Sequence, residues 1–179
     1  MTCSEAFLKS YSAAVTVGLV LGSLTGRDGL GAQSYAKLIQ ASDGNLYGTT
    51  YVGGEKGRGT VFRQTLAGVL TTLHAFQDGK DEPMLPYAGL VEGPDGHLYG
   101  STMRGGTSDA GTLFRLTLAG ERTVLHQFSG GDGQNPEGTL IVGSDGNLYG
   151  TTLIGGDNDR GVIFRITPGG TYTLLYSFP

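Results

Sequence analysis

Short apolar segments separated by glycine-rich polar segments run from about Leu38 to the C-terminus, and their order repeats three times. In the first unit the apolar segments read "LIQA", "NLYGTT", "GTVFRQT" and "LTTLHAF". They are rich in β-branched and aromatic residues, which is typical of strands. An Asp-Gly pair after the first segment indicates a tight hairpin turn. The pattern therefore predicts four short antiparallel strands per unit and no long helix.

The repeat has a nearly constant length. Asp43 and Asp95 are 52 residues apart, and Asp95 and Asp145 are 50 residues apart. A period of about fifty residues is the size of a propeller blade. We therefore predict an all-β, β-propeller-like array of three four-stranded repeats (38–89, 90–139 and 140–179) that form one domain. A β-trefoil, which also has three four-stranded repeats, is the alternative fold.

The predicted strands carry apolar residues on both faces. In the third strand of the first unit, Phe62 points to one side and Val61 to the other. Sheets covered on both faces fit blades that pack against neighbouring blades. Gly48 and its counterparts Gly100 and Gly150 lie inside a strand, where glycine weakens the sheet unless other atoms must approach closely. We therefore expect these glycines to serve packing and not a ligand.

The first 37 residues leave two interpretations open. "LGSLTGRDG" at Leu21–Gly29 aligns without gaps with "LHQFSGGDG" at Leu125–Gly133. This alignment predicts an N-terminal tail over 1–15, followed by an orphan fourth strand near Thr16–Leu24 and a linker that ends at residue 37. Alternatively, the apolar Ala13–Leu24 is the core of a signal peptide, since it is too short to span a bilayer as a helix.

Composition and charge exclude several function classes. The net charge is −4, and the 12 Lys and Arg residues are scattered, which argues against a nucleic-acid surface. Cys3 is the only cysteine, so the chain has no intrachain disulfide and no cysteine-based zinc site.

His74 and His126 occupy one position in successive units, too far apart to share a metal ion. No nucleophile elbow, dinucleotide loop or phosphate loop is present, so we predict no catalytic residue and no cofactor.

The loops differ in how strictly they repeat. The turns after the first strands read "SDGN", "PDGH" and "SDGN", whereas the loops after the second strands read "GGEKGRG", "GGTSDAG" and "GGDNDRG". In a four-stranded meander these two sets lie on opposite faces. Diversified loops on one face indicate recognition, although drift in unconstrained loops is the alternative. The charged residues expected to bind a ligand are Arg58, Arg104, Asp109, Asp132, Asp157, Asp159 and Arg160.

With its strand motifs in this order, the chain resembles the GloVer-type (choice-of-anchor) tandem-repeat family of bacterial proteins. The resemblance covers about Leu21 to Pro179. It implies a propeller-like fold and an exported or surface-attached protein. The family has no settled biochemical activity, so the resemblance assigns no catalytic residue.

We expect a non-enzymatic repeat scaffold or recognition module, extracellular or at the cell surface, whose polar partner is a glycan or an exported protein. One alternative is a lactonase- or lyase-type enzyme with a central polar site, although the first strands offer only Gln40 and Glu92, with Val142 in the third unit. A truncated paralogue without independent function is another. Because one-chain propellers normally have four to eight blades, three units also predict self-association to complete a ring. No membrane span is predicted.

Overall fold

The computed structural model describes residue 31 and residues 33–79 and 81–179. These residues form three four-stranded antiparallel sheets and no helix. We call the sheets blades 1, 2 and 3. Blade 1 contains β1 (Ile39–Gln40), β2 (Leu46–Thr50), β3 (Thr60–Gln64) and β4 (Leu70–Ala75). Blade 2 contains β5 (Val91–Glu92), β6 (Leu98–Thr102), β7 (Thr112–Leu116) and β8 (Arg122–Gln127). Blade 3 contains β9 (Ile141–Val142), β10 (Leu148–Thr151), β11 (Val162–Ile166) and β12 (Tyr172–Ser177).

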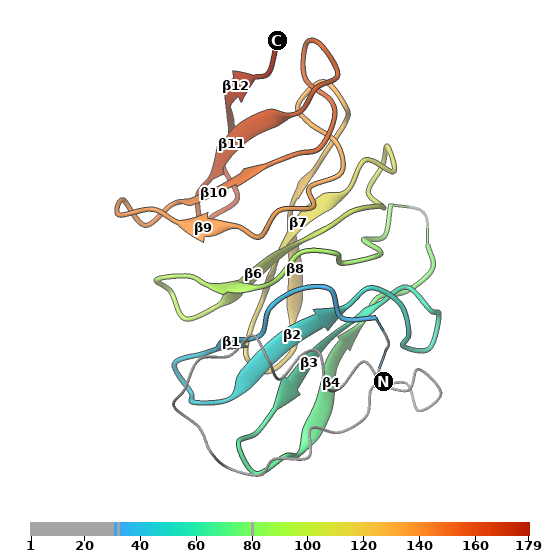
Figure 1. The fold of residues 1–179 in the computed structure, drawn as a ribbon, viewed down its shortest axis with the longest axis vertical. Coiled ribbons are helices and arrows are strands. Elements are labelled where there is room, and N and C mark those ends of the chain that lie inside the picture. Colours follow the sequence, from blue (N-terminus) through green and yellow to red (C-terminus); the bar gives the residue numbers. More distant parts are fainter. Residues whose placement is uncertain (1–30, 32, 80) are drawn as a thin grey trace.

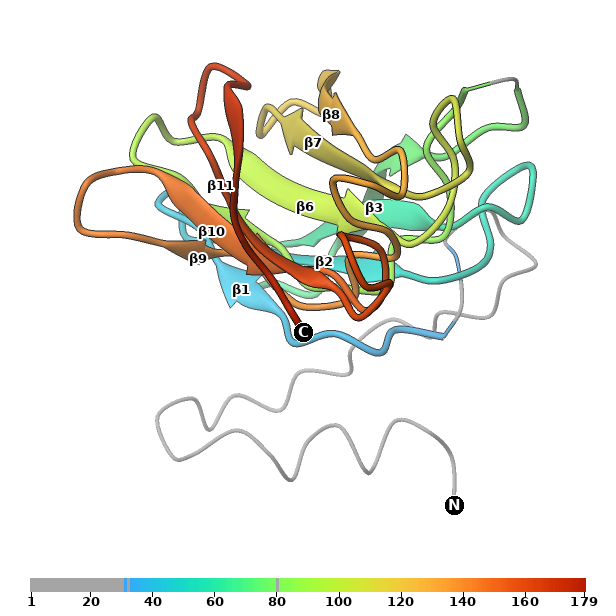
Figure 2. The same cartoon turned by 90° about the horizontal axis from the view of Figure 1, so that it is seen from above.

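The strands pair in chain order within every blade, so each blade is a simple meander. Figure 1 shows the three blades stacked along the long axis of the molecule. In Figure 2 the short first strands β1 and β9 lie on one side of the stack, and β7 and β8 lie on the opposite side. The predicted all-β, propeller-like array is confirmed. The trefoil alternative does not fit, because no sheet combines strands of different units. The orphan strand predicted near Thr16–Leu24 lies outside the described residues.

The core lies between the blades. One buried cluster joins residues of blade 1 to residues of blade 2: Ala41, Tyr47, Val61 and Phe76 with Leu90, Leu98, Phe114 and Leu116. A second cluster joins blade 2 to blade 3 in the same way: Tyr99, Ala110, Leu113 and Phe128 with Leu140, Leu148, Val162, Phe164 and Ile166. We call the face of a blade on the side of the following blade its forward face, and the face on the side of the preceding blade its backward face.

The strand glycines allow a phenylalanine to cross the backward face. A Cβ atom at Gly100 would lie 2.7 Å from Cζ of Phe114, on the neighbouring strand β7, and one at Gly150 would lie 2.5 Å from Cζ of Phe164. A Cβ atom at Gly48 would lie 2.6 Å from Cζ of Phe62 in blade 1. The expectation that these glycines serve packing is therefore confirmed.

The Asp-Gly turn fixes a tyrosine as well as the hairpin. Asp43 Oδ1 accepts a hydrogen bond from the Asn45 backbone N–H at 3.0 Å, and Asp43 Oδ2 accepts one from the Tyr47 hydroxyl at 2.7 Å. Burial and this hydrogen bond raise the pKa of Tyr47 to about 12. The corresponding Asp–Tyr bonds in blades 2 and 3 are 2.7 and 2.8 Å long. The recurring "DGNLYG" motif is therefore a folding element.

Among the described residues, no further blade covers the forward face of blade 3. Its Ile141, Leu175 and Tyr176 are 64%, 47% and 50% exposed. The counterparts of Leu175 are Leu73 and Leu125, and each packs against the core cluster between its own blade and the next one. Blade 3 therefore presents to solvent the positions that blades 1 and 2 use to bind the following blade.

Candidate functional site

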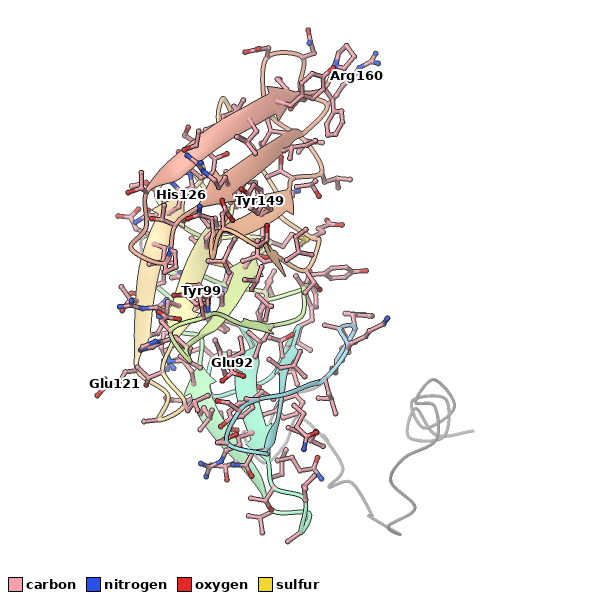
Figure 3. The ribbon with its side chains drawn as sticks, turned by 90° about the vertical axis from the view of Figure 1, so that its left-hand side faces the viewer. Glu92, Tyr99, Glu121, His126, Tyr149 and Arg160 are labelled. Carbon is pink, nitrogen blue, oxygen red and sulfur yellow. The ribbon has the colours of Figure 1, made fainter. Side chains whose placement is uncertain are left out.

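The meander topology divides the blade ends into two faces. The turns after the first and third strands form one, which we call the turn face. The segments 51–59, 103–111 and 152–161 between second and third strands, together with the linkers between blades, form the other, which we call the loop face. In Figure 3, Glu121, in a turn after a third strand, and Arg160, in a loop after a second strand, lie at opposite sides of the molecule.

Two of the predicted ligand-binding residues close their own loops. Asp109 Oδ1 accepts a hydrogen bond from the Gly105 backbone N–H at 2.8 Å, and Asp159 Oδ1 accepts one from the Gly155 N–H at 2.9 Å. Both aspartates adopt left-handed backbone conformations, with φ of 51° and 54°. Gly57 holds the equivalent position of blade 1 with φ of 70°. One oxygen of each carboxylate is thus committed to the loop.

Three more of these residues also have partners within the protein. Arg58 forms an ion pair with Asp78, and Arg104 Nη1 lies 3.2 Å from Asp109 Oδ2. Asp132 accepts hydrogen bonds from the backbone N–H and hydroxyl of Ser129 and lies 2.9 Å from Nε2 of His126.

The last two predicted residues, Asp157 and Arg160, are exposed, and their side chains have no partner in the described part of the chain. The seven predicted residues come from loops of all three blades, and among them the structure pairs only Arg104 with Asp109.

His74 and His126 lie where their blades meet the following blade, whereas His97 lies in the Asp95 turn. The ring of His126 stacks on Tyr172 of blade 3, with centroids 3.9 Å apart and planes at 6°. Burial lowers the pKa of His126, although Asp132 acts in the opposite direction. Burial, and secondarily the charge of Arg122 on blade 2, lower the pKa of His74 to about 4. The repeat position that His74 and His126 share is therefore explained by a neutral imidazole that packs against the following blade.

Among the described residues, no group of three or more His, Cys, Asp or Glu side chains is arranged to hold a metal ion. Within the same residues, no helix has the length and apolar character needed to cross a membrane.

An aromatic cluster on the loop face was missed by the sequence analysis. Tyr35 precedes β1, Tyr51 follows β2 and Tyr87 precedes β5. The rings of Tyr35 and Tyr87 are stacked, with centroids 5.1 Å apart and planes at 27°, and Tyr51 meets both rings edge-on. Tyr35 is 57% exposed and Tyr87 is 37% exposed. We call these three residues the tyrosine platform.

A pocket of about 390 Å³ continues from the platform. Its lining comes from the segments that precede β5 and β9, the end of β10 and the loop that follows it: Tyr87, Glu137, Gly138, Thr151, Thr152 and Leu153. Tyr87 belongs to both features and joins them. The repeat offsets place Tyr35, Tyr87 and Glu137 at one position of successive units. The sequence signal that could have indicated this site was the change at that position from tyrosine in the first two units to glutamate in the third.

Comparison with known proteins identifies the repeat and the fold. The model of the Gloeobacter/Verrucomicrobia repeat matches residues 10–179, which confirms the resemblance to the GloVer-type repeats. The chain matches no curated protein sequence.

Solved structures similar to this chain include three enzymes. Virginiamycin B lyase from Staphylococcus aureus is 22% identical with a TM-score of 0.52, and a streptogramin B lyase is 22% identical with a TM-score of 0.54. A gluconolactonase from Xanthomonas campestris is 20% identical with a TM-score of 0.52. The alignments cover 77%, 79% and 79% of this chain but only 39%, 40% and 46% of those proteins. At these identities the likeness shows the fold alone.

Proposed function

We propose that this chain, which belongs to the Gloeobacter/Verrucomicrobia repeat family, is an exported recognition module that binds a polar partner through its loop face. The observation that carries the proposal is the contrast between the two faces. The turn face repeats one set of hydrogen bonds in all three blades. The loop face instead carries different residues in each blade, together with the pocket and exposed aromatic rings.

Within this proposal the charged loop residues have graded roles. Asp157 and Arg160 contact the partner directly, because both are exposed and neither side chain has a partner among the described residues. Arg58, Arg104, Asp109, Asp132 and Asp159 have partners of their own and contribute their remaining hydrogen-bonding atoms. Charge-assisted bonds from such groups suit a glycan or the surface of another exported protein.

The enzymatic alternative lacks a free polar group on the first strands. Glu92 accepts hydrogen bonds from both the backbone N–H and the hydroxyl of Ser42, at 2.8 and 2.5 Å. Gln40 donates to the carbonyl of Gly44 at 3.0 Å. Glu92 thus joins its strand to the blade 1 turn, and Gln40 closes its own turn, so the binding role is the better supported one.

We also propose that the chain self-associates through the forward face of blade 3. The exposed Ile141, Leu175 and Tyr176 stand where the other blades bury residues against a following blade. Apolar patches of this kind mark interaction sites. In the assembled form, with blades taken as 38–89, 90–139 and 140–179, a second copy covers this face.

The recognition proposal is tested by comparing the two faces. The double variant Asp157→Ala/Arg160→Ala changes the loop face, and Glu121→Ala/Thr171→Ala changes exposed residues of the turn face. Binding to a glycan array and to purified exported proteins of the source organism is measured for both. We expect the loop-face variant to lose binding and the turn-face variant to keep it, with unchanged melting temperatures. Retained binding in the first variant together with loss in the second would refute the assignment of the face.

A further inference from the structure

The tyrosine platform exposes aromatic surface that the fold itself does not use. The rings of Tyr35 and Tyr87 stack on each other and are absent from both buried core clusters. Tyrosine rings carry a large apolar area with a polar tip, which is why they are enriched where a ligand is bound. Two such rings stacked on each other form a rigid unit, and Tyr87 of this unit lines the pocket.

Unpaired polar groups lie beside this surface. The half-buried carboxylate of Glu137 and the exposed hydroxyl of Thr151 both line the pocket. Neither side chain forms a hydrogen bond or ion pair with another described residue. Their oxygens are therefore available to a ligand that occupies the pocket, and a carboxylate accepts hydrogen bonds from hydroxyl groups at roughly twice the strength of a neutral acceptor.

From this geometry we propose that Tyr87 and Glu137 form a subsite for a neutral pyranose ring of a glycan. The inference rests on the proposed function and names the ligand class of the loop face. The ring's C–H face stacks on the tyrosine platform, and its hydroxyl groups donate hydrogen bonds to Glu137 and Thr151. The pocket is a shallow depression open to solvent, with a volume of about 390 Å³.

Charge selects among the glycans. Glu137 is an anionic acceptor in the pocket, and the whole chain has a net charge of −4. An acidic sugar would bring a second carboxylate toward Glu137, and like charges at such distances repel. A neutral hexose instead supplies the hydroxyl donors that the carboxylate needs. The subsite therefore favours neutral over acidic oligosaccharides.

The repeat explains why the subsite occurs once. Tyr35, Tyr87 and Glu137 share one repeat position, so only the junction of blades 2 and 3 places a tyrosine beside a glutamate. At the junction of blades 1 and 2 the same position brings two tyrosines together. The two junctions thus provide a stacking surface and a hydrogen-bonding end, which fit successive parts of an oligosaccharide chain.

The test uses the full chain and four neutral hexasaccharides: cello-, laminari-, malto- and mannohexaose. Isothermal titration calorimetry measures affinity, and hexagalacturonic acid serves as the acidic comparison. We expect at least one neutral probe to bind at millimolar or lower concentration and hexagalacturonic acid to bind more weakly. Tyr87→Ala and Glu137→Gln should each weaken binding by about tenfold or more, as expected when a stacking or charge-assisted contact is lost.

Matched variants separate the site from general effects. Tyr87→Phe keeps the ring and should keep most of the affinity. Leu66→Ala removes an apolar side chain that is 51% exposed in a blade 1 turn, and Glu121→Gln removes an exposed carboxylate on the turn face. Neither should change binding. Melting temperatures confirm that every variant is folded.

Three outcomes would overturn the inference: no binding of any neutral probe, equal affinity of the wild type and Tyr87→Ala, or a preference for hexagalacturonic acid. The proposed function fails separately. If Asp157→Ala/Arg160→Ala abolishes binding of a partner while Tyr87→Ala leaves it unchanged, the loop face is the binding face and the pyranose subsite is wrong.

Discussion

His74 shows how a single side chain ties stability to pH. Burial, and then Arg122, lower its pKa to about 4, while Glu82 acts in the opposite direction. In the unfolded chain a histidine titrates near pH 6.5. Because the unfolded state binds the proton first, the stabilising contribution of neutral His74 is complete above about pH 6.5. It falls as the pH drops toward about 4.

We therefore expect the free energy of unfolding to decrease between about pH 7 and about pH 4. Urea denaturation followed by circular dichroism measures the decrease. His74→Gln should make this decrease in the free energy of unfolding smaller. The decrease that remains includes the contribution of His126, whose pKa is also lowered. An identical pH dependence in His74→Gln and in the wild type would contradict this account. The comparison is made above about pH 4. Below that pH, three aspartates with lowered pKa values also lose their contribution to the free energy of unfolding: Asp43, Asp95 and Asp145.

The loop between β6 and β7 depends on Asp109 in two ways. Its carboxylate accepts the hydrogen bond from the Gly105 N–H, and its backbone is left-handed. Asp109→Ala removes the acceptor and places an unfavourable residue in that conformation, so we expect a loss of about 1–3 kcal/mol in the free energy of unfolding. Asp109→Asn keeps an oxygen acceptor and tolerates the conformation, and it should stay within about 0.5 kcal/mol of the wild type.

Chemical denaturation of both variants checks this prediction. Equal losses for Ala and Asn would show that the charge, and not the loop geometry, is what matters. A small loss of unfolding free energy in Asp109→Ala would instead indicate that the loop does not need Asp109 and that this residue serves only a ligand.

The elements were largely predictable, because each unit repeats its strand pattern and its turn chemistry. The sequence pattern places Val61 and Phe62 on opposite faces, and both faces are buried. The first strands came out shorter than expected, at Ile39–Gln40, where the pattern suggested four residues. Strand pairing there ends early because the chain turns at once into the Asp43 hairpin.

The site was predictable only in part. Charge and loop diversity singled out Asp109, but the partner of its carboxylate is a backbone N–H four residues earlier, which residue type alone does not reveal. The tyrosine platform joins Tyr35 to Tyr87, 52 residues later, and depends on how successive blades stack. Contacts that arise between units cannot be inferred from the pattern within one unit.

For the whole molecule, the exposed forward face of blade 3 predicts self-association. Light scattering after size-exclusion chromatography should give the mass of a dimer or a larger assembly. Leu175→Glu, at a position 47% exposed on that face, should shift the protein toward the monomer, because an assembly would bury the new charge without a partner. Leu66→Glu, at a position 51% exposed in a blade 1 turn, is the control and should leave the mass unchanged. A monomeric wild type would remove the basis for a second copy on blade 3.

The contacts between blades also bear on how such genes change in length. Most residues of the two core clusters, which join successive blades, occupy the same repeat positions. A stretch of about fifty codons, the size of one repeat, therefore encodes a forward and a backward surface that match those of any other copy. Unequal recombination that adds or deletes one such stretch leaves every remaining junction with a complementary partner. Related genes should accordingly differ by whole repeats far more readily than by fractions of one, and without compensating substitutions elsewhere.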